Sequence, residues 1–270
     1  MVICKNCSHS EPHNLKGGYC SQYVIDSIFK DRNYCFCNKF ELGDKGGLKQ
    51  EMKVLELFSG TESFSKVARE KGYQTFTIDN DISFHPNLCV DILALDSNLI
   101  KVDTSWDNID IIWASPPCTC FSVASISTHW KGGFRKYIPK TNEAEISLEL
   151  IKKTLNLIDE LSPTFWYIEN PIGMLRKMPM MKRLPRRVSV TYCQYGDNRM
   201  KPTDIWTNNL SWIPRPKCKN GSPCHESAPR GSKTGTQGLN NAKERAKIPK
   251  ELCLEILKSM ETKANVQTSL

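Results

Sequence analysis

Residues 109–122 read IDIIWASPPCTCFS, an apolar run that leads into a short loop. A β-branched run bounded by two prolines is typical of a buried strand that stops abruptly. Pro116 and Pro117 fix φ and lack backbone N–H donors, so we expect Cys118 in a rigid turn past the carboxyl end of a strand. Open α/β sheets bind their ligands at that edge. Cys118 is therefore a candidate nucleophile, although most cysteines are simply small buried hydrophobic residues.

Predicted strands and helices alternate around this segment. A helix begins at the capping box NEAE (residues 142–145) and ends near Leu161, and another is opened by Pro249. Two further strands form a β-hairpin that would close one edge of the sheet. We expect strands at residues 53–58, 75–79, 89–93, 109–113 and 165–168, a helix at 66–71, and hairpin arms at 188–192 and 204–207. This order predicts a mostly parallel α/β sheet with an antiparallel edge hairpin.

The first 50 residues form a separate predicted unit, because they contain five cysteines and end in a glycine-rich linker at 43–47. The candidate metal ligands are Cys4, Cys7, Cys20, Cys35 and Cys37. Cys-x2-Cys followed by a later pair is typical of structural zinc, with either Cys35 or Cys37 as the fourth ligand. Unligated cysteines and an iron–sulfur cluster remain alternatives. We therefore predict a zinc-binding module at residues 1–50 and a larger domain at residues 51–270.

Residues 208–240 are rich in Pro, Gly, Ser and Lys and are predicted to be irregular. They contain Cys218, Cys224 and His225, which are possible metal ligands. Because a structural zinc site needs four ligands and only three are visible, a second metal site stays an open alternative.

Basic residues are concentrated in two parts of a chain with net charge +8. One is residues 176–187, which hold Arg176, Lys177, Lys182, Arg183, Arg186 and Arg187 and no acidic residue; the other is residues 215–250. Such clustering fits a nucleic-acid backbone, although a solvated basic face would look the same. No stretch of about 18 apolar residues and no signal peptide occur, so we expect no membrane partner and a cytoplasmic or nucleoid-associated protein. The 12 cysteines are then expected to be reduced.

The first predicted strand leads through Gly60 into a helix, which is the arrangement that holds ligands in Rossmann-type folds. The second strand ends in Asp79, about 20 residues later, where a carboxylate can accept both ribose hydroxyls of an adenosine. Asp79 could equally be a turn former.

Six motifs in order resemble those of the DNA cytosine-5 methyltransferases. They are LFSGTES (57–63), TIDND (77–81), VDI (90–92), SPPCTCFS (115–122), IENP (168–171) and YGDNRMK (195–201). The resemblance spans about residues 54–206 and implies a Rossmann-like, S-adenosylmethionine-dependent fold that acts on DNA. Since a cytosine inside a duplex is out of reach, it also implies base flipping.

The resemblance implies roles for individual residues. Cys118 would add to carbon 6 of cytosine, and Glu169 would protonate ring nitrogen 3. Asn170 would hold the loop between them, while Arg199 and Lys201 would steady the Glu169 carboxylate, the base or a phosphate. The implied cofactor residues are Phe58, Ser59, Gly60, Thr61, Asp79, Asn80, Asp91, Ile92 and Pro116.

Three residues depart from the family pattern: Glu62 replaces Gly, Thr119 replaces Gln and Pro171 replaces Val. Glu62 at a helix N-terminus could compete with the carboxylate of the cofactor or bind its ammonium group. The target-recognition region, at about 208–240, is also short. Alternative functions are therefore the same chemistry on another pyrimidine substrate or with a group other than methyl, and an inactive, metal-stapled nucleic-acid-binding protein.

Overall fold

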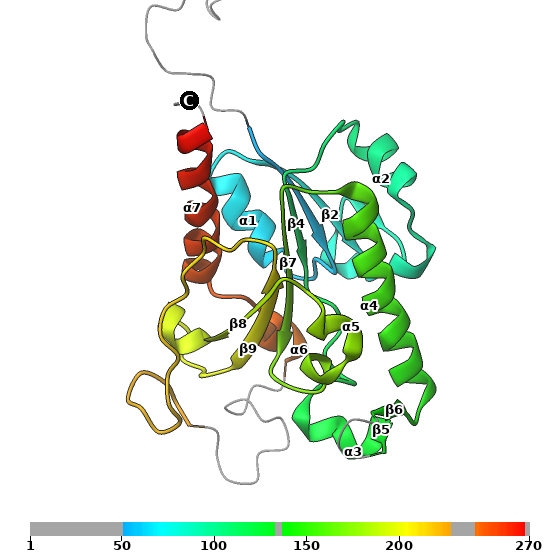
Figure 1. Cartoon of the computed structure of the whole chain (residues 1–270), viewed down its shortest axis with the longest axis vertical. Coiled ribbons are helices and arrows are strands. Elements are labelled where there is room, and N and C mark those ends of the chain that lie inside the picture. The colour runs from blue at the N-terminus through cyan, green and yellow to red at the C-terminus, as the bar shows by residue number, and fades with distance from the viewer. Residues whose placement is uncertain (1–50, 133–136, 228–240, 268–270) are drawn as a thin grey trace, which may run out of the picture. The chain divides into compact units, whose positions relative to one another are not determined.

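The computed structural model describes residues 51–132, 137–227 and 241–267. A seven-stranded sheet with the order β3-β2-β1-β4-β7-β9-β8 forms its centre (Figure 1). The strands are β1 (Lys53–Leu57), β2 (Gln74–Asp79), β3 (Leu88–Cys89), β4 (Ile111–Ala114), β7 (Phe165–Pro171), β8 (Arg186–Thr191) and β9 (Pro202–Thr207). The first five are parallel, and β9 pairs antiparallel with both β7 and β8. The predicted parallel sheet with an edge hairpin is thus confirmed.

Helices cover both faces of the sheet. Figure 1 shows α2 (Ser97–Thr104) and α4 (Asn142–Leu161) on one side, and α1 (Ser63–Glu70) and α7 (Lys250–Gln267) on the other. Successive residues of β4 alternate between the two cores: Ile112 belongs to the α4 side and Trp113 to the α1 side, where its ring stacks on Phe64 at 4.5 Å between centroids. Because every β4 side chain is buried, apolar residues occupy consecutive positions, as expected of a central parallel strand.

Shorter elements lie mostly in the connections. They are η1 (Ile82–Phe84), η2 (Ile92–Ala94), η3 (Val123–Ser125), α3 (Ile126–His129), the two-stranded sheet β5 (Trp130–Lys131) and β6 (Ile138–Pro139), η4 (Leu175–Lys177), α5 (Pro179–Lys182), η5 (Tyr192–Tyr195) and α6 (Ala242–Ala246). Within the described ranges, no helix has the length and apolar character needed to span a bilayer.

The helix predicted to run from residue 142 to about Leu161 is confirmed as α4. The helix predicted at residues 66–71 begins earlier, at Ser63. Two further details of the prediction were wrong. The strand expected at residues 89–93 is only Leu88–Cys89, because the Asp91 carboxylate accepts from the Leu93 N–H at 2.9 Å and starts a 3₁₀ turn. The N-cap of α4 is Thr141, one residue before the predicted capping box, and its Oγ1 accepts from the Ala144 N–H at 3.3 Å. The predicted zinc module, with its five cysteines, lies outside the described residues.

Candidate active site

The Cys118 loop and Glu169 emerge from neighbouring strands. β4 and β7 run parallel with Ala114 opposite Ile168, so the chain leaves β4 toward Cys118 beside the end of β7 that carries Glu169. Cys118 is exposed, whereas the Glu169 side chain is buried. The adjacency that the sequence predicted for these two residues follows directly from this strand order.

Contacts between the two segments fix the Cys118 loop. The Asn170 side-chain amide donates to the Pro116 carbonyl at 2.9 Å, as expected of a residue that holds the loop. The Met174 N–H donates to the Phe121 carbonyl at 2.7 Å. A Cβ atom at Gly173 would lie 2.1 Å from that same carbonyl oxygen, so only glycine permits this approach. The segment after β7 therefore braces the loop on which Cys118 is presented.

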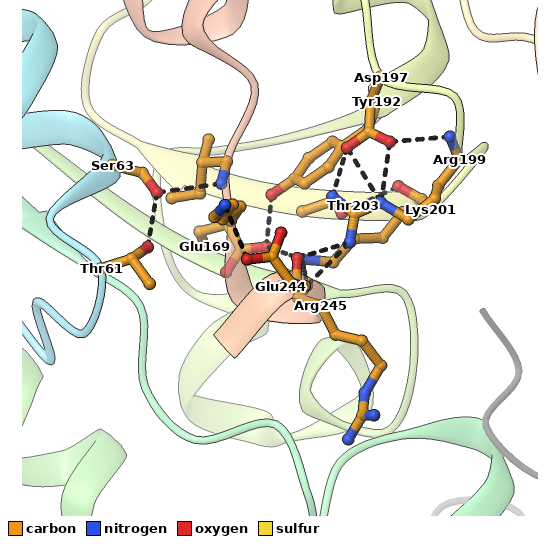
Figure 2. A network of polar contacts seen from close by, with 12 residues as sticks. Thr61, Ser63, Glu169, Tyr192, Asp197, Arg199, Lys201, Thr203, Glu244 and Arg245 are labelled. Atoms are coloured by element: carbon orange, nitrogen blue, oxygen red, sulfur yellow. Dashed lines mark hydrogen bonds and ion pairs between the residues drawn. The ribbon is translucent and has the colours of Figure 1, made fainter. Parts of the chain in front are cut away.

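The Glu169 carboxylate lies in a polar network with two side chains (Figure 2). Tyr192 donates its hydroxyl to Glu169 Oε1 at 2.8 Å, and Lys201 Nζ lies 3.9 Å from the same oxygen. Lys201 also lies over the Tyr192 ring, 4.6 Å from its centroid. The carboxylate is thus oriented from one side by a neutral donor and a cation. The sequence analysis missed Tyr192, whose position at the end of β8 gives no local signal.

The Cys118 thiol experiences opposing influences. Partial desolvation by the surrounding protein raises its pKa above the usual range, and the negative charge of Glu169 raises it further. The cations of Lys201 and Arg245 lower the pKa. The thiol is therefore held mostly protonated in the free protein, and nearby positive charge is needed to favour the thiolate.

Arg199 has a different environment from Lys201. It is buried, donates from Nε to Asp197 Oδ1 at 2.8 Å, and donates from Nη1 to the carbonyls of Glu244 at 3.0 Å and Arg245 at 3.3 Å (Figure 2). Lys201 Nζ also donates to the Arg245 carbonyl at 3.0 Å. Arg199 and Lys201 were expected to steady the Glu169 carboxylate, the base or a phosphate. Of the two, Lys201 lies beside Glu169, whereas the described contacts of Arg199 fix the end of α6.

The predicted cofactor turn follows β1. Phe58 and Gly60 have φ values of 55° and 46°, and the Gly60 N–H donates to Asp79 Oδ2 at 2.8 Å. The other carboxylate oxygen of Asp79 accepts from the Asp81 N–H at 2.9 Å. Ser59 Oγ is buried and has no hydrogen-bond partner among the described residues. Asp79 therefore organises the turn, and the turn presents an unused hydroxyl.

The other predicted cofactor residues follow β2, β3 and β4. Asn80 and Asp91 are exposed, whereas Ile92 and Pro116 are buried. The carboxylate of Glu62, the N-cap residue of α1, is paired. It forms an ion pair with Arg69 and accepts a hydrogen bond from Thr77 Oγ1 at 3.3 Å.

A pocket of about 430 Å³ opens beside this turn. It is lined by Gly60, Thr61, Glu62, Lys66, Ser83, Phe84, His85, Lys243 and Lys247. Lys243 Nζ donates to Ser83 Oγ at 3.2 Å and lies 4.4 Å from the centre of the Phe84 ring. The Ile248 N–H donates to Ser63 Oγ at 3.2 Å, and Ser63 in turn contacts Thr61 (Figure 2). The segment around α6 thus returns to the cofactor turn. The sequence did not predict that the segment around α6 lies beside the cofactor turn, although Lys243 and Lys247 belong to the basic region at 215–250.

The basic run at 176–187, which the sequence predicted to suit a nucleic-acid backbone, is only partly exposed. Arg176 donates from Nε to Asp204 Oδ2 at 2.7 Å, and Arg186 Nη1 donates to three carbonyls, including that of Trp212 at 2.7 Å. These two residues hold the edge hairpin together. The exposed members are Lys177, Lys182, Arg183 and Arg187.

Comparison with known proteins assigns the family. Residues 52–183 match the family of C-5 cytosine-specific DNA methylases. A protein named "Probable DNA (cytosine-5)-methyltransferase" from Frog virus 3 (isolate Goorha) is 32% identical over 167 residues, which cover 61% of this chain and 74% of that protein. This chain belongs to the DNA cytosine-5 methyltransferases. Membership of this family makes the protein an S-adenosylmethionine-dependent DNA methyltransferase. The resemblance that the six motifs indicated is confirmed.

Solved structures with lower similarity also match the methyltransferase. A candidate DNA modification methyltransferase encoded within an E. coli prophage is 19% identical, with a TM-score of 0.45 over 61% of this chain and 51% of that chain. The Entamoeba histolytica methyltransferase EhMeth is 14% identical, with a TM-score of 0.44 over 63% of this chain and 58% of that chain. The chain thus spans little more than half the length of these solved proteins.

Proposed function

We propose that this methyltransferase transfers a methyl group from S-adenosylmethionine to carbon 5 of cytosine in DNA, with Cys118 as nucleophile and Glu169 as general acid. The observation that carries the proposal is the placement of Cys118 beside the strand end of Glu169, where Asn170 fixes the loop and Tyr192 and Lys201 orient the carboxylate. A thiol and an oriented carboxyl group at adjacent strand ends suit nucleophilic addition to a polarised ring.

The chemistry follows from the electron flow in the ring. The Cys118 thiolate adds to carbon 6, and the electrons of the carbon 5–carbon 6 double bond make carbon 5 nucleophilic. Glu169 takes up a proton as the base binds. Its donation of that proton to ring nitrogen 3 stabilises the charge that develops there, and Lys201 compensates the carboxylate left behind. When bound, S-adenosylmethionine would supply the electrophilic methyl group to carbon 5 and leave as the neutral thioether. Loss of the carbon 5 proton to solvent then expels the Cys118 thiolate and restores the double bond, and the proton on ring nitrogen 3 returns to the Glu169 carboxylate.

The residues around the β1 turn fit such a cofactor. The buried Ser59 Oγ has no hydrogen-bond partner in the part of the chain that the structure describes. The adjacent pocket carries Lys66, Lys243 and Lys247, which suit a carboxylate. We assign Phe58, Ser59, Gly60, Thr61, Asp79, Asn80, Asp91, Ile92 and Pro116 to this site, since they lie on the turn or follow β2, β3 and β4.

Structural zinc in the 1–50 module, bound by Cys4, Cys7, Cys20 and Cys35 or Cys37, is part of the proposal and depends on cysteine spacing alone.

DNA binding would use the exposed basic residues on α5 and near it. A flipped cytosine is the substrate form that reaches Cys118, because a stacked base is inaccessible. The recognition region, residues 208–240, is short, so the target is expected to be short or relaxed.

Trapping on 5-fluorocytosine tests the proposal. Fluorine cannot leave carbon 5 as a proton does, so an oligonucleotide with this base and S-adenosylmethionine should yield a covalent adduct of protein, DNA and one methyl group, read by intact mass. Cys118→Ser should form no adduct, whereas Cys89→Ser, which changes another exposed cysteine, should form it normally. A folded wild-type protein that traps neither single- nor double-stranded DNA would contradict the proposal; an adduct on RNA or a free nucleotide would redirect it to another pyrimidine substrate.

A further inference from the structure

Four metal-ligating side chains converge outside the active site. They are Cys193, Cys218, Cys224 and His225, whose ligand atoms all lie within 4.8 Å of one another. Cys193 belongs to η5, and the other three belong to the loop after β9. The sequence analysis recognised only three of these candidate ligands. The fourth, Cys193, lies 25 residues before Cys218, too far along the chain to form part of a local motif. We propose that this cluster binds one structural zinc ion, independently of the cysteines in residues 1–50.

The distances suit a tetrahedral ion. Cys218 Sγ lies 3.2 Å from Cys224 Sγ and 3.4 Å from His225 Nδ1, and Cys224 Sγ lies 3.7 Å from the same nitrogen. A tetrahedral site with Zn–S bonds of about 2.3 Å and a Zn–N bond of about 2.0 Å has edges of roughly 3.5–3.8 Å. The sulfur pair is also well beyond the S–S bond length of about 2.05 Å, and both cysteines are free. Three thiolates and an imidazole are a usual zinc donor set.

The histidine supports a ligand role. His225 Nε2 is buried and has no hydrogen-bond partner among the described residues. Its Nδ1 is within 4 Å of two cysteine sulfurs. Because Nδ1 faces the two sulfurs, it is the nitrogen that would bind the ion, and the ring proton would then stay on Nε2.

The position of the cluster indicates what the ion would do. Between β9 and α6, the described residues form neither helix nor strand. The Cys218 N–H donates to Thr191 Oγ1, at the end of β8, at 2.9 Å. The Glu226 N–H donates to the carbonyl of Asn198, between η5 and β9, at 2.9 Å. Zinc would fasten this loop to η5, which begins with the Tyr192 that orients Glu169. A short irregular segment with few apolar residues needs such a cross-link.

Metal content of the full-length chain tests the site without any activity assay. Cys193→Ser, Cys218→Ser and His225→Ala should each lose about one zinc per chain relative to wild type, measured by inductively coupled plasma mass spectrometry. His225→Cys should retain that zinc, because four thiolates also form a structural site. Cys89→Ser is the matched control and should lose none. Equal zinc content in the wild type and the cluster variants would overturn the proposal.

Differential alkylation provides a readout that needs no variant. In zinc-replete wild type, peptide mapping should find Cys218 and Cys224 protected from iodoacetamide until a chelator is added, whereas the exposed Cys89 reacts either way. Equal reactivity of Cys218 and Cys224 with and without chelator, or a Cys218–Cys224 disulfide that lowers the intact mass by about 2 Da, would contradict a zinc site. Both measurements are independent of whether the chain methylates cytosine.

Discussion

The Tyr192 hydroxyl donates a 2.8 Å hydrogen bond to Glu169 Oε1, and both side chains are buried. This bond joins the edge hairpin to the strand that carries the carboxylate, because Tyr192 follows β8 and Glu169 lies in β7. Burial, together with the Glu169 charge, raises the pKa of Tyr192 well above its usual range. The phenol therefore stays protonated and remains a donor over the working pH range.

Replacing Tyr192 with Phe should slow methyl transfer by roughly 10- to 100-fold, since a hydrogen bond to a charged group is worth about 1.5–3 kcal/mol. The reason is the loss of a fixed carboxylate orientation, so single-turnover methylation should show it while DNA affinity is unchanged. Tyr195→Phe is the control, because that hydroxyl donates to Glu255 away from the site. Equal rates for the two variants would show that Glu169 does not need Tyr192.

Replacing Lys201 with Met should raise the pKa of Cys118 further, because a cation that favours the thiolate is removed. The pH midpoint of Cys118 alkylation then moves upward, and the rate at neutral pH falls by roughly 3- to 10-fold. Peptide mapping measures the rate, with the exposed Cys89 as internal standard. Lys177→Met, which removes an exposed charge, should leave the midpoint unchanged. A downward shift for Lys201→Met would contradict this electrostatic role.

Glu56 couples stability to pH. Its buried carboxyl accepts from the Ser65 N–H at 2.8 Å at the start of α1, and burial raises its pKa from 4.5 to about 7. The folded state therefore holds a proton that the unfolded state releases, so this group favours folding below pH 4.5 and loses that contribution as the pH rises to 7. The full effect is about 3 kcal/mol.

The matching variant is Glu56→Gln, which keeps an oxygen acceptor and removes the titration. Its unfolding free energy minus that of wild type should increase from pH 5 to pH 8, as measured by urea denaturation. The exposed Glu149 provides the control, because Glu149→Gln should give a difference that does not change with pH. A flat difference for Glu56→Gln would mean that this carboxyl is ionised throughout the range.

The basic run should divide into two functional groups. Changing exposed Lys182 and Arg183 to Gln should lower the slope of log affinity against log salt for DNA by about 2, since each phosphate contact contributes about 0.9. Arg176→Gln should instead destabilise the fold by about 3 kcal/mol, because it removes the cation that pairs with the fully buried Asp204 and leaves the neutral Ser189 hydroxyl as a donor to that carboxylate. Salt-dependent binding and thermal unfolding measure the two effects. Unchanged stability in Arg176→Gln would contradict the separation.

The sequence alone determined the order of strands and helices and the location of the chemical groups. Apolar runs such as residues 109–113 are local signals, and a proline pair ends a strand wherever it occurs, so the position of Cys118 was predictable. Because neighbouring parallel strands end at one edge, the adjacency of Glu169 followed too. The third strand was predicted too long, because a single side-chain bond from Asp91 redirects the chain after β3, and strand propensity does not register it.

Only the tertiary structure decided which partner each charged or thiol group has. Arg199 hydrogen-bonds to Asp197 and to the end of α6, and Arg176 pairs with Asp204. Cys193 lies within metal-binding distance of thiols in a loop that begins 25 residues later in the chain. No local pattern encodes these pairings, since they depend on how the edge hairpin and α6 pack against the sheet. Composition counts the charges and thiols of a chain, whereas packing determines which of them remain exposed and which are brought within bonding distance.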